Sequence, residues 1–314
     1  IVAFKDPFLA AAKPEWSLHN ADGTVFYDKD GLAWVNPYEP GVWDYLVEVS
    51  KGAIELGFDE VQFDYVRFST DSGMKQVDFG PLAEGKTKED AVTEFVSYAA
   101  DALHAMGAAV SADVYGVVID SEIDQQIVGQ DYSQLCSVLD AISPMVYPSH
   151  YGPYNYDIPV PDAQPYDTVL AAMQASRKVL AGLDPKLEGT AKSTGTVSGN
   201  DVTVSGNAAV SGNDASVSGN DTEPQVIPFT KEEIAAMEPT EEVTAAVRPW
   251  LQDFTATWVA GHIQYGPQQI RDQIRAVYDA GYEEWILWNA ANRYTEGGLL
   301  PEDGAALDPS RTEG

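Results

Sequence analysis

The stretch Gly57-Phe-Asp-Glu-Val-Gln-Phe-Asp-Tyr-Val-Arg67 decides the fold of this chain, because it places an acid at the end of a buried strand. Successive side chains of a strand point to opposite faces, so Gln62 and Asp64 share one face. The other face is apolar and carries Val61, Phe63 and Tyr65. A helical pattern over 41–56 stops at Gly57, as helices commonly do at glycine. Helix, glycine, strand and acid in this order are typical of a (β/α) barrel, whose active sites lie at the C-terminal ends of the strands.

Composition narrows the classes of partner. The chain has 18 Lys and Arg residues against 49 Asp and Glu residues, which gives a formal net charge of −31. Such a charge repels polyanions, so we exclude nucleic acid and anionic membrane surfaces and favour a neutral polysaccharide. The single cysteine, Cys136, excludes an internal disulfide and a cysteine-built zinc site.

The sequence predicts no membrane-spanning segment, since no run reaches the roughly 18 apolar residues that a spanning helix needs. The chain opens on Ile1-Val-Ala-Phe-Lys-Asp-Pro7, which lacks an initiator methionine and has the pattern of a buried strand. We interpret it as part of a longer precursor whose targeting segment lies upstream. We therefore expect an extracytoplasmic protein, secreted or attached to the cell envelope, and leave its oligomeric state open.

Strand and helix patterns alternate along the chain. Strands are predicted at 1–5, 60–67, 108–115, 141–147, 247–253 and 284–289, and helices at 41–56, 88–106, 167–182 and 267–280. Alternation of this kind predicts a parallel sheet. We therefore predict an α/β fold, a (β/α)8 TIM barrel that is N-terminally truncated here, with about six of its eight strands present. The barrel is assigned to residues 1–183 and 247–314.

Residues 184–246 form a low-complexity insert between the two barrel segments. The motif Val-Ser-Gly-Asn recurs at Val197, Val204, Val210 and Val217. Because the repeat contains too few apolar side chains to form a packed core, we predict a disordered surface insert. Calcium binding by its Asn-Asp pairs is the alternative, although the ligand spacing and the closing glutamate of a calcium loop are missing.

Strand alternation also predicts which side chains point into the barrel. The inward positions on 108–115, 141–147 and 247–253 are Ser111, Asp113, Tyr115, Ser143, Met145, Tyr147 and Gln252. Asp253 follows at the rim, and His150 lies in the loop after 141–147. Aromatic side chains on which sugar rings can stack cluster at the same ends: Tyr65, Tyr115, Tyr147, Tyr151, Tyr154, Trp250, Trp288 and Tyr294.

Asp64 and Asp113 are predicted to be close neighbours, because adjacent strands lie about 4.8 Å apart. Two such acids do not ionise independently, and one keeps its proton near neutral pH, which separates a general acid from a nucleophile or base. This division is the chemistry of glycosidic bond cleavage. Two other interpretations stay open: Asp64 as a structural acid paired with Arg67 or Lys5, and Asp113 as a residue that orients another group.

Other enzyme chemistries find little support in the sequence. The four histidines, His19, His104, His150 and His262, lack zinc-ligand spacing. The motifs GxSxG, GxGxxG and GxxxxGK[ST] do not occur. We therefore expect no metal and no organic cofactor, and an esterase or deacetylase ranks below a glycosidase.

Seven motifs that occur in order give the chain a family resemblance. They are Phe4-Lys-Asp-Pro7, Ala33-Trp-Val-Asn-Pro-Tyr38, Gly57-Phe-Asp-Glu-Val-Gln-Phe-Asp-Tyr-Val-Arg-Phe68, Ser111-Ala-Asp-Val-Tyr-Gly116, Ser143-Pro-Met-Val-Tyr-Pro148, Arg248-Pro-Trp-Leu-Gln-Asp-Phe254 and Trp285-Ile-Leu-Trp-Asn289. On these motifs the chain resembles the bacterial glycoside hydrolase domain formerly classed as a domain of unknown function. The similarity spans the chain except for the Val-Ser-Gly-Asn insert.

The resemblance implies a TIM barrel that starts near its third strand, so that 60–67 and 108–115 are the fourth and fifth strands. By analogy with amylase-like barrels, it also implies Asp64 and Asp113 as nucleophile and acid. A fainter similarity to chitinase-type barrels ends at Val66, where those enzymes carry their catalytic glutamate.

Together these arguments predict a glycoside hydrolase that cleaves a polysaccharide by a two-carboxylate, retaining mechanism. Asp64 and Asp113 are the predicted catalytic residues. The predicted substrate-binding residues are Arg67, Tyr65, Tyr115, Tyr147, His150, Gln252, Asp253, Trp288 and Asn289. The alternative is a catalytically inactive carbohydrate-binding or cell-envelope module on the same barrel.

Overall fold

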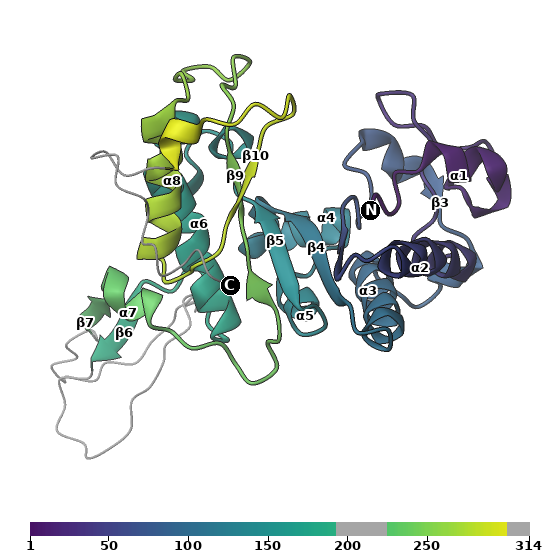
Figure 1. The fold of residues 1–314 in the computed structure, drawn as a ribbon, viewed down its shortest axis with the longest axis horizontal. Coiled ribbons are helices and arrows are strands. Elements are labelled where there is room, and N and C mark those ends of the chain that lie inside the picture. Colours follow the sequence, from purple (N-terminus) through teal and green to yellow (C-terminus); the bar gives the residue numbers. More distant parts are fainter. Residues whose placement is uncertain (193–224, 300–314) are drawn as a thin grey trace, which may run out of the picture.

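The computed structural model describes residues 1–192 and 225–299, and its centre is a curled parallel sheet (Figure 1). The strand order is β10-β9-β5-β4-β2, and β8 pairs with β5. The strands are β2 (Glu60–Phe63), β4 (Ala109–Tyr115), β5 (Ala141–Met145), β8 (Ala246–Val247), β9 (Trp250–Gln252) and β10 (Ile286–Trp288). All pairings within this sheet are parallel. The described chain therefore has the predicted α/β barrel architecture, in the form of an open half-barrel.

The first residues of the chain extend the sheet beyond β2. Val2 forms a parallel bridge with Asp64, and the N–H groups of Ala3 and Phe4 donate to the carbonyl oxygens of Asp64 and Tyr65 at 2.8 and 3.2 Å. The strand predicted at 1–5 is therefore present as a short bridge beside the residues that end β2. The strand predicted at 247–253 is divided into β8 and β9.

Helices cover the outer face of the sheet (Figure 1). The helices α2 (Pro40–Glu55) and α3 (Lys88–His104) pack together beside β2 and β4, and α6 (Pro165–Leu180) and α8 (Pro267–Asp279) pack together beside β9. Proline in the first turn favours the start of α2, α6 and α8, because that position needs no N–H donor. The shorter α4 (Glu122–Val128) and α5 (Tyr132–Cys136) lie between β4 and β5 in the chain. None of the described helices is long and apolar enough to cross a membrane.

The apolar faces of the strands form the core with these helices. On β2, Val61 and Phe63 are buried, and the Phe63 ring lies 5.3 Å from Phe95 of α3. On β4, Val110, Ala112 and Val114 are fully buried. The predicted alternation of outward apolar and inward polar side chains is therefore confirmed for both strands.

Residues 5–39 form an excursion that the strand and helix periodicity did not predict. It contains α1 (Pro7–Ala12) and β1 (His19–Asn20), and β1 pairs antiparallel with β3 (Val77–Asp78). Trp34 of this excursion packs edge-on against Tyr65, with ring centroids 6.0 Å apart, so the excursion reaches the end of β2. Short 3-10 turns lie at Pro14–Trp16, Ser72–Gln76, Pro81–Ala83, Gly116–Ile119, Pro148–His150, Asn155–Asp157, Pro161–Ala163 and Glu296–Gly298.

The insert predicted at 184–246 is described only at its two ends. There, β6 (Gly189–Lys192) and β7 (Gln225–Pro228) pair antiparallel, and α7 (Lys231–Ala235) begins at a capping box formed by Thr230 and Glu233. These ends depart from the predicted disorder, because the two strands satisfy each other's backbone groups and α7 contacts α6. The four Val-Ser-Gly-Asn motifs lie outside the described residues.

Candidate active site

The interior face of the sheet carries polar side chains in successive layers. In the first layer, Oε1 of Glu60 accepts hydrogen bonds from Oγ of Ser111 and Nη2 of Arg248, both at 2.5 Å. Burial opposes ionisation of Glu60, but the hydrogen bonds and the charge of Arg248 lower its pKa overall. This ion pair links the beginning of β2 to β4 and to the segment between β8 and β9, away from the C-terminal ends of the strands.

Asp113 of β4 lies in the next layer and is 8% exposed. Its Oδ1 accepts hydrogen bonds from Nε2 of Gln62 at 2.6 Å and from Nε1 of Trp250 at 2.5 Å. Burial and the charge of Asp64 raise the pKa of Asp113 to about 6, against the opposing effect of the two hydrogen bonds. Because both donors bind Oδ1, the proton of the neutral acid belongs on Oδ2, where it can be donated.

Asp64 follows the C-terminal end of β2, beside Asp113. Phe63 pairs with Ala112 across the two strands, so the next positions along the chain are neighbours. The N–H group of Tyr65 donates to Oδ1 of Asp64 at 2.6 Å, and Tyr65 has a φ of 51°, which bulky residues rarely adopt. Such backbone strain clusters at functional sites. Here the strained turn orients the carboxylate of Asp64 at the open end of the sheet.

The alternative interpretation was that Asp64 forms a structural ion pair, but its carboxylate has no such partner in the described part of the chain. Among residues 1–192 and 225–299, neither Lys5 nor Arg67 contacts the carboxylate of Asp64. Nζ of Lys5 lies instead 3.0 Å from Oδ2 of Asp28 and 3.3 Å from Oδ2 of Asp30. Lys5 therefore neutralises acids of the 5–39 excursion.

Gln130 supports the carboxylate pair, and the sequence analysis did not identify it. The side chain is fully buried. Its Oε1 accepts from the N–H of Tyr115 at 3.1 Å, and its Nε2 donates to the carbonyl oxygens of Asp113 at 3.2 Å and Val66 at 3.4 Å. Gln130 thus fixes the ends of β2 and β4 relative to each other. No local sequence pattern predicts this role of Gln130, because its hydrogen-bond partners lie at the ends of two separate strands.

Tyr147 lies close to both carboxylates. It is 4% exposed, and burial, together with the charges of Asp113 and Asp64, raises the pKa of its phenol. The phenol therefore stays neutral and can donate a hydrogen bond toward the site. His150 lies at the rim, exposed, with its ring 5.1 Å from that of Tyr147.

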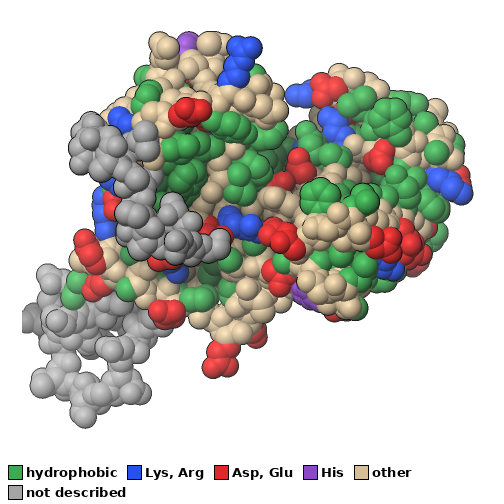
Figure 2. Space-filling view, viewed as in Figure 1, with side chains coloured by type: hydrophobic (Ala, Val, Ile, Leu, Met, Phe, Trp, Pro, Cys, Tyr) green, Lys and Arg blue, Asp and Glu red, His purple; other side chains and the backbone are tan. Residues whose placement is uncertain are grey.

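Two tryptophans extend the site from Asp113 toward the surface. Trp250, which donates to Asp113, meets Trp288 edge-on with ring centroids 5.8 Å apart. Trp288 is 42% exposed. In the space-filling view, the surface is hollowed between the half that contains α6 and α8 and the half that contains α2 and α3 (Figure 2).

Gln252 was predicted to bind substrate, but its side chain binds other protein groups instead. It is fully buried, and its Oε1 accepts from the N–H of Ser149 at 3.0 Å. Its Nε2 donates to Oδ1 of Asp162 at 2.9 Å and to the carbonyl oxygen of Phe254 at 3.0 Å. Because these partners occupy the amide, Gln252 stabilises the loops at the rim.

Asp253 and Asn289 also bind neighbouring protein groups. Both carboxylate oxygens of Asp253 are occupied by Thr295, through its N–H at 2.7 Å and its Oγ1 at 2.6 Å. Nδ2 of Asn289 donates to the carbonyl oxygen of Asp253, and its Oδ1 accepts from the N–H of Ala291. The predicted rim acid is therefore engaged in holding the segment after β10.

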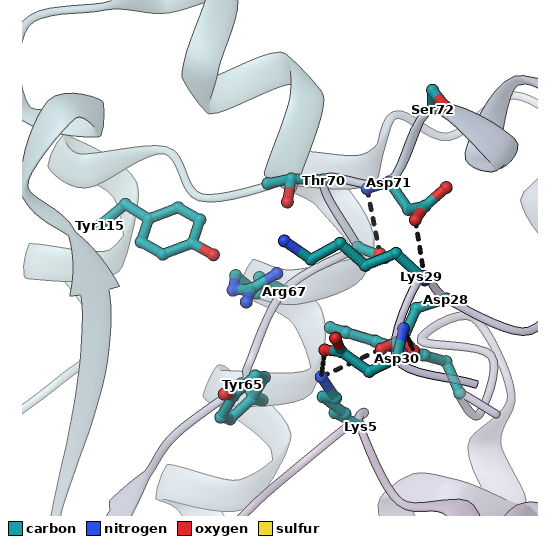
Figure 3. A pocket seen from close by; sticks show the side chains of 12 residues that line it. Lys5, Asp28, Lys29, Asp30, Tyr65, Arg67, Thr70, Asp71, Ser72 and Tyr115 are labelled. Carbon is teal, nitrogen blue, oxygen red and sulfur yellow. Dashed lines mark hydrogen bonds and ion pairs between the residues drawn. The ribbon is translucent and has the colours of Figure 1, made fainter. Parts of the chain in front are cut away.

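A cavity of about 500 Å³ opens near the C-terminal ends of β2 and β4, and its lining includes neither Asp64 nor Asp113 (Figure 3). Tyr65, the residue after Asp64, and Tyr115, the last residue of β4, both line it. Arg67 also lines it, and its guanidinium lies 4.5 Å from the ring centroid of Tyr115, 5.0 Å from Tyr65 and 5.3 Å from Trp34. Tyr65 was predicted on the helix-facing side of the strand. The turn at its positive φ directs it into the cavity instead.

No group of three or more His, Cys, Asp or Glu side chains in the described part of the chain is arranged to hold a metal ion. The predicted site residues thus fall into two sets. The carboxylate pair, Tyr65, Arg67, Tyr115, Tyr147, His150 and Trp288 lie around the open end of the sheet, whereas Gln252, Asp253 and Asn289 support its rim.

Comparison with known proteins gives one family match and several similar structures. A family described as "Putative glycosyl hydrolase domain" matches residues 1–189 and 213–294. No curated protein matches the chain. A crystal structure of a hypothetical protein from Ruminiclostridium thermocellum is 41% identical, over 36% of this chain and 55% of that one, with a TM-score of 0.32.

Two structures of lower identity cover more of the chain. The PgaB (BpsB) glycoside hydrolase domain from Bordetella bronchiseptica is 10% identical over 82% of this chain and 59% of that one, with a TM-score of 0.45. The spore cortex-lytic enzyme SleL from Bacillus megaterium is 13% identical over 86% of this chain and 54% of that one, with a TM-score of 0.41. The chain thus spans little more than half the length of the structures it resembles. Because the family match covers most of its residues, the chain belongs to this glycosyl hydrolase family.

Proposed function

We propose that the chain hydrolyses a glycosidic bond of a polysaccharide with two carboxylates, Asp113 as general acid and Asp64 as nucleophile. The observation that carries this proposal is the position of Asp64 beside Asp113, whose pKa is raised to about 6. An acid that keeps its proton near neutral pH beside a second carboxyl group is the arrangement that glycosidases use.

In the first step, Oδ2 of Asp113 donates its proton to the glycosidic oxygen while a carboxylate oxygen of Asp64 attacks the anomeric carbon. The bond to the leaving sugar breaks, and a glycosyl ester forms on Asp64. In the second step, the Asp113 carboxylate removes a proton from water, and the resulting hydroxide attacks the anomeric carbon and releases Asp64. Two inversions give net retention, which suits carboxylates on adjacent strands, because retaining enzymes hold them about 5 Å apart.

The surroundings of the pair support a sugar polymer as substrate. Tyr147 can donate a hydrogen bond to a sugar hydroxyl, and the exposed ring of Trp288 provides an apolar face beside Trp250. A polymer bound across Trp288 and Tyr147 would lie close to Asp113, which Trp250 contacts and whose charge acts on Tyr147. A polysaccharide substrate implies an enzyme that works outside the cytoplasm, so we propose an extracytoplasmic location.

The roles of the two carboxylates are tested by isosteric substitution. Asp64→Asn should lower kcat by at least about a thousandfold on any polysaccharide that the wild type cleaves, because the amide is a poor nucleophile. Asp113→Asn should slow cleavage of substrates with poor leaving groups far more than that of activated aryl glycosides, which need little proton donation. Asp253→Asn is the control, and it should lower the melting temperature while keeping most of kcat, because Thr295 occupies that carboxylate.

Stereochemistry and binding decide the remaining alternatives. Proton NMR of the first product should show the anomer of the substrate, and the opposite anomer would contradict the nucleophilic role of Asp64. Full activity of Asp64→Asn would reject the assignment of that residue. If the protein binds polysaccharides but cleaves none of a broad panel, it is a carbohydrate-binding module on a hydrolase fold.

A further inference from the structure

The cavity near the C-terminal ends of β2 and β4 contains a buried cation without a carboxylate partner. Arg67 is 8% exposed, and within residues 1–192 and 225–299 its guanidinium donates to one acceptor, the carbonyl oxygen of Phe68, through Nη1 at 2.9 Å. A guanidinium has five N–H groups. Burial lowers the pKa of Arg67, although the nearby charges of Asp64 and Asp28 oppose this shift.

The acids that share the cavity with Arg67 are engaged elsewhere. Asp28 accepts from Nζ of Lys5, from Nε1 of Trp34 and from backbone N–H groups; burial opposes its ionisation, but these contacts hold its pKa at about 2. Asp71 accepts from the backbone N–H groups of Lys29 and Gly73. Asp30, the third acid of the lining, lies 3.3 Å from Nζ of Lys5, so none of the three acids forms an ion pair with Arg67 in the described part of the chain.

A second cation reaches into the cavity from this excursion. The side chain of Lys29 extends across the cavity toward Tyr115, over Arg67 (Figure 3). No hydrogen bond or ion pair of its ammonium group is found in the described part of the chain. Arg67 and Lys29 thus present two cations between the aromatic rings of Tyr65 and Tyr115.

We propose that this cavity is a subsite for a sugar that carries a carboxylate, such as a uronic acid. This inference rests on the proposed function, because it specifies the substrate of the same enzyme. The planar guanidinium of Arg67 matches a carboxylate in a bidentate hydrogen bond, and Lys29 adds a second charge. A cavity of about 500 Å³ is in the usual range for small-ligand sites.

The subsite adjoins the scissile position. Tyr65 directly follows Asp64, and Tyr115 lies two residues after Asp113 on the same strand. A sugar held in the cavity is therefore within one or two units of the bond that is cleaved, and its carboxylate orients the chain of the polymer.

The net charge of −31 limits the kind of acidic glycan that fits. A dense polyanion is repelled by the molecule as a whole, whereas a single carboxylate is screened from distant charges beyond about 8 Å at physiological salt and meets mainly Arg67 and Lys29. The cavity therefore selects a glycan with spaced carboxylates on a largely neutral backbone.

The test compares acidic glycans with their carboxyl-reduced counterparts, which keep the linkage and lose only the charge. Calorimetric binding to oligosaccharides of glucuronoxylan, hyaluronan and polygalacturonate is measured with Asp64→Asn, so that no ligand is cleaved. At least one acidic glycan should bind about tenfold or more tightly than its reduced form, with glucuronoxylan favoured over polygalacturonate. Arg67→Gln and Lys29→Gln in the same background should each remove most of that preference. Lys75→Gln, an equal charge change at an exposed lysine outside the cavity, should keep it.

Each outcome bears on the inference separately from the proposed function. Equal binding of acidic and reduced glycans in all three pairs, or a preference that survives both Arg67→Gln and Lys29→Gln, overturns the subsite even if the wild type cleaves neutral polysaccharides. Carboxylate-dependent binding without turnover in the wild type supports the subsite and rejects the hydrolase mechanism. Because Lys29 is exposed, its variant reports on binding even if Arg67→Gln does not fold.

Discussion

At the scale of single residues, the site depends on one carboxyl group whose surroundings oppose its charge. Asp113 is buried, faces the charge of Asp64, and as an anion is stabilised by hydrogen bonds from Trp250 and Gln62. Asp64, at the end of its strand, accepts the N–H of Tyr65. The position of Asp113 within its strand, buried and facing Asp64, thus favours the neutral form of that carboxyl group.

The raised pKa of Asp113 predicts how stability depends on pH. The group titrates near 3.8 when unperturbed and at about 6 in the folded protein. Between these values the folded state holds a proton that the unfolded state has released, so this stabilisation is complete below about pH 4 and is lost as pH rises to 6. The loss amounts to about 3 kcal/mol, at 1.36 kcal/mol per pKa unit.

Urea unfolding of the wild type and Asp113→Asn between pH 3.5 and 7 measures this effect. The difference in unfolding free energy between the two proteins should change by about 3 kcal/mol across the window, because the amide does not titrate. The rate of glycoside cleavage should fall above pH 6 in parallel, as the general acid loses its proton. A difference that stays constant with pH would show that Asp113 has an ordinary pKa.

At the scale of elements, the connection after β4 holds the site together. The helix α4 ends at Gly129, which has a φ of 76°, and Gln130 then turns inward to bond the ends of β2 and β4. A Cβ at position 129 would lie 2.7 Å from the carbonyl oxygen of Lys88. The position thus requires glycine both for its backbone conformation and for its packing against the start of α3.

Gly129→Ala and Gly107→Ala separate these two requirements. Gly107 has a φ of 80°, but a Cβ added there would meet no atom within 4 Å, so its substitution should cost only the conformational strain of about 1 kcal/mol. Gly129→Ala should cost about 3 kcal/mol, since it adds a clash with backbone, and it should lower kcat by displacing Gln130. Equal melting temperatures of the two variants would contradict the tight packing at Gly129.

At the scale of the whole molecule, the residues on either side of 193–224 pair with each other. The family match omits residues 190–212, and the strands β6 and β7 that flank residues 193–224 pair with each other, with Lys192 opposite Gln225. The two ends of the segment therefore meet, so a long connection between them is not needed to close the fold.

Replacing residues 193–224 by Asn-Gly should leave the barrel intact, because that dipeptide closes an antiparallel pair in a two-residue turn. The melting temperature should change by less than about 3 °C, which corresponds to about 1 kcal/mol in a domain of this size. Activity toward the substrate should be retained. A fall of more than about 5 °C would show that the segment packs against the barrel.

The order of residues alone predicts the alternation of helices and strands and the apolar faces of β2 and β4, with Asp64 and Asp113 on the opposite faces. These follow from the periodicity of a local segment, which is visible in the order of residues. The site itself depends on contacts between distant segments. Trp250 reaches Asp113 across 137 positions, Gln130 links two strands, Thr295 occupies Asp253, and the 5–39 excursion brings Lys29 and Trp34 to the cavity of Arg67. These contacts could not be predicted, because they depend on strand register and on the paths of loops, which no local pattern encodes.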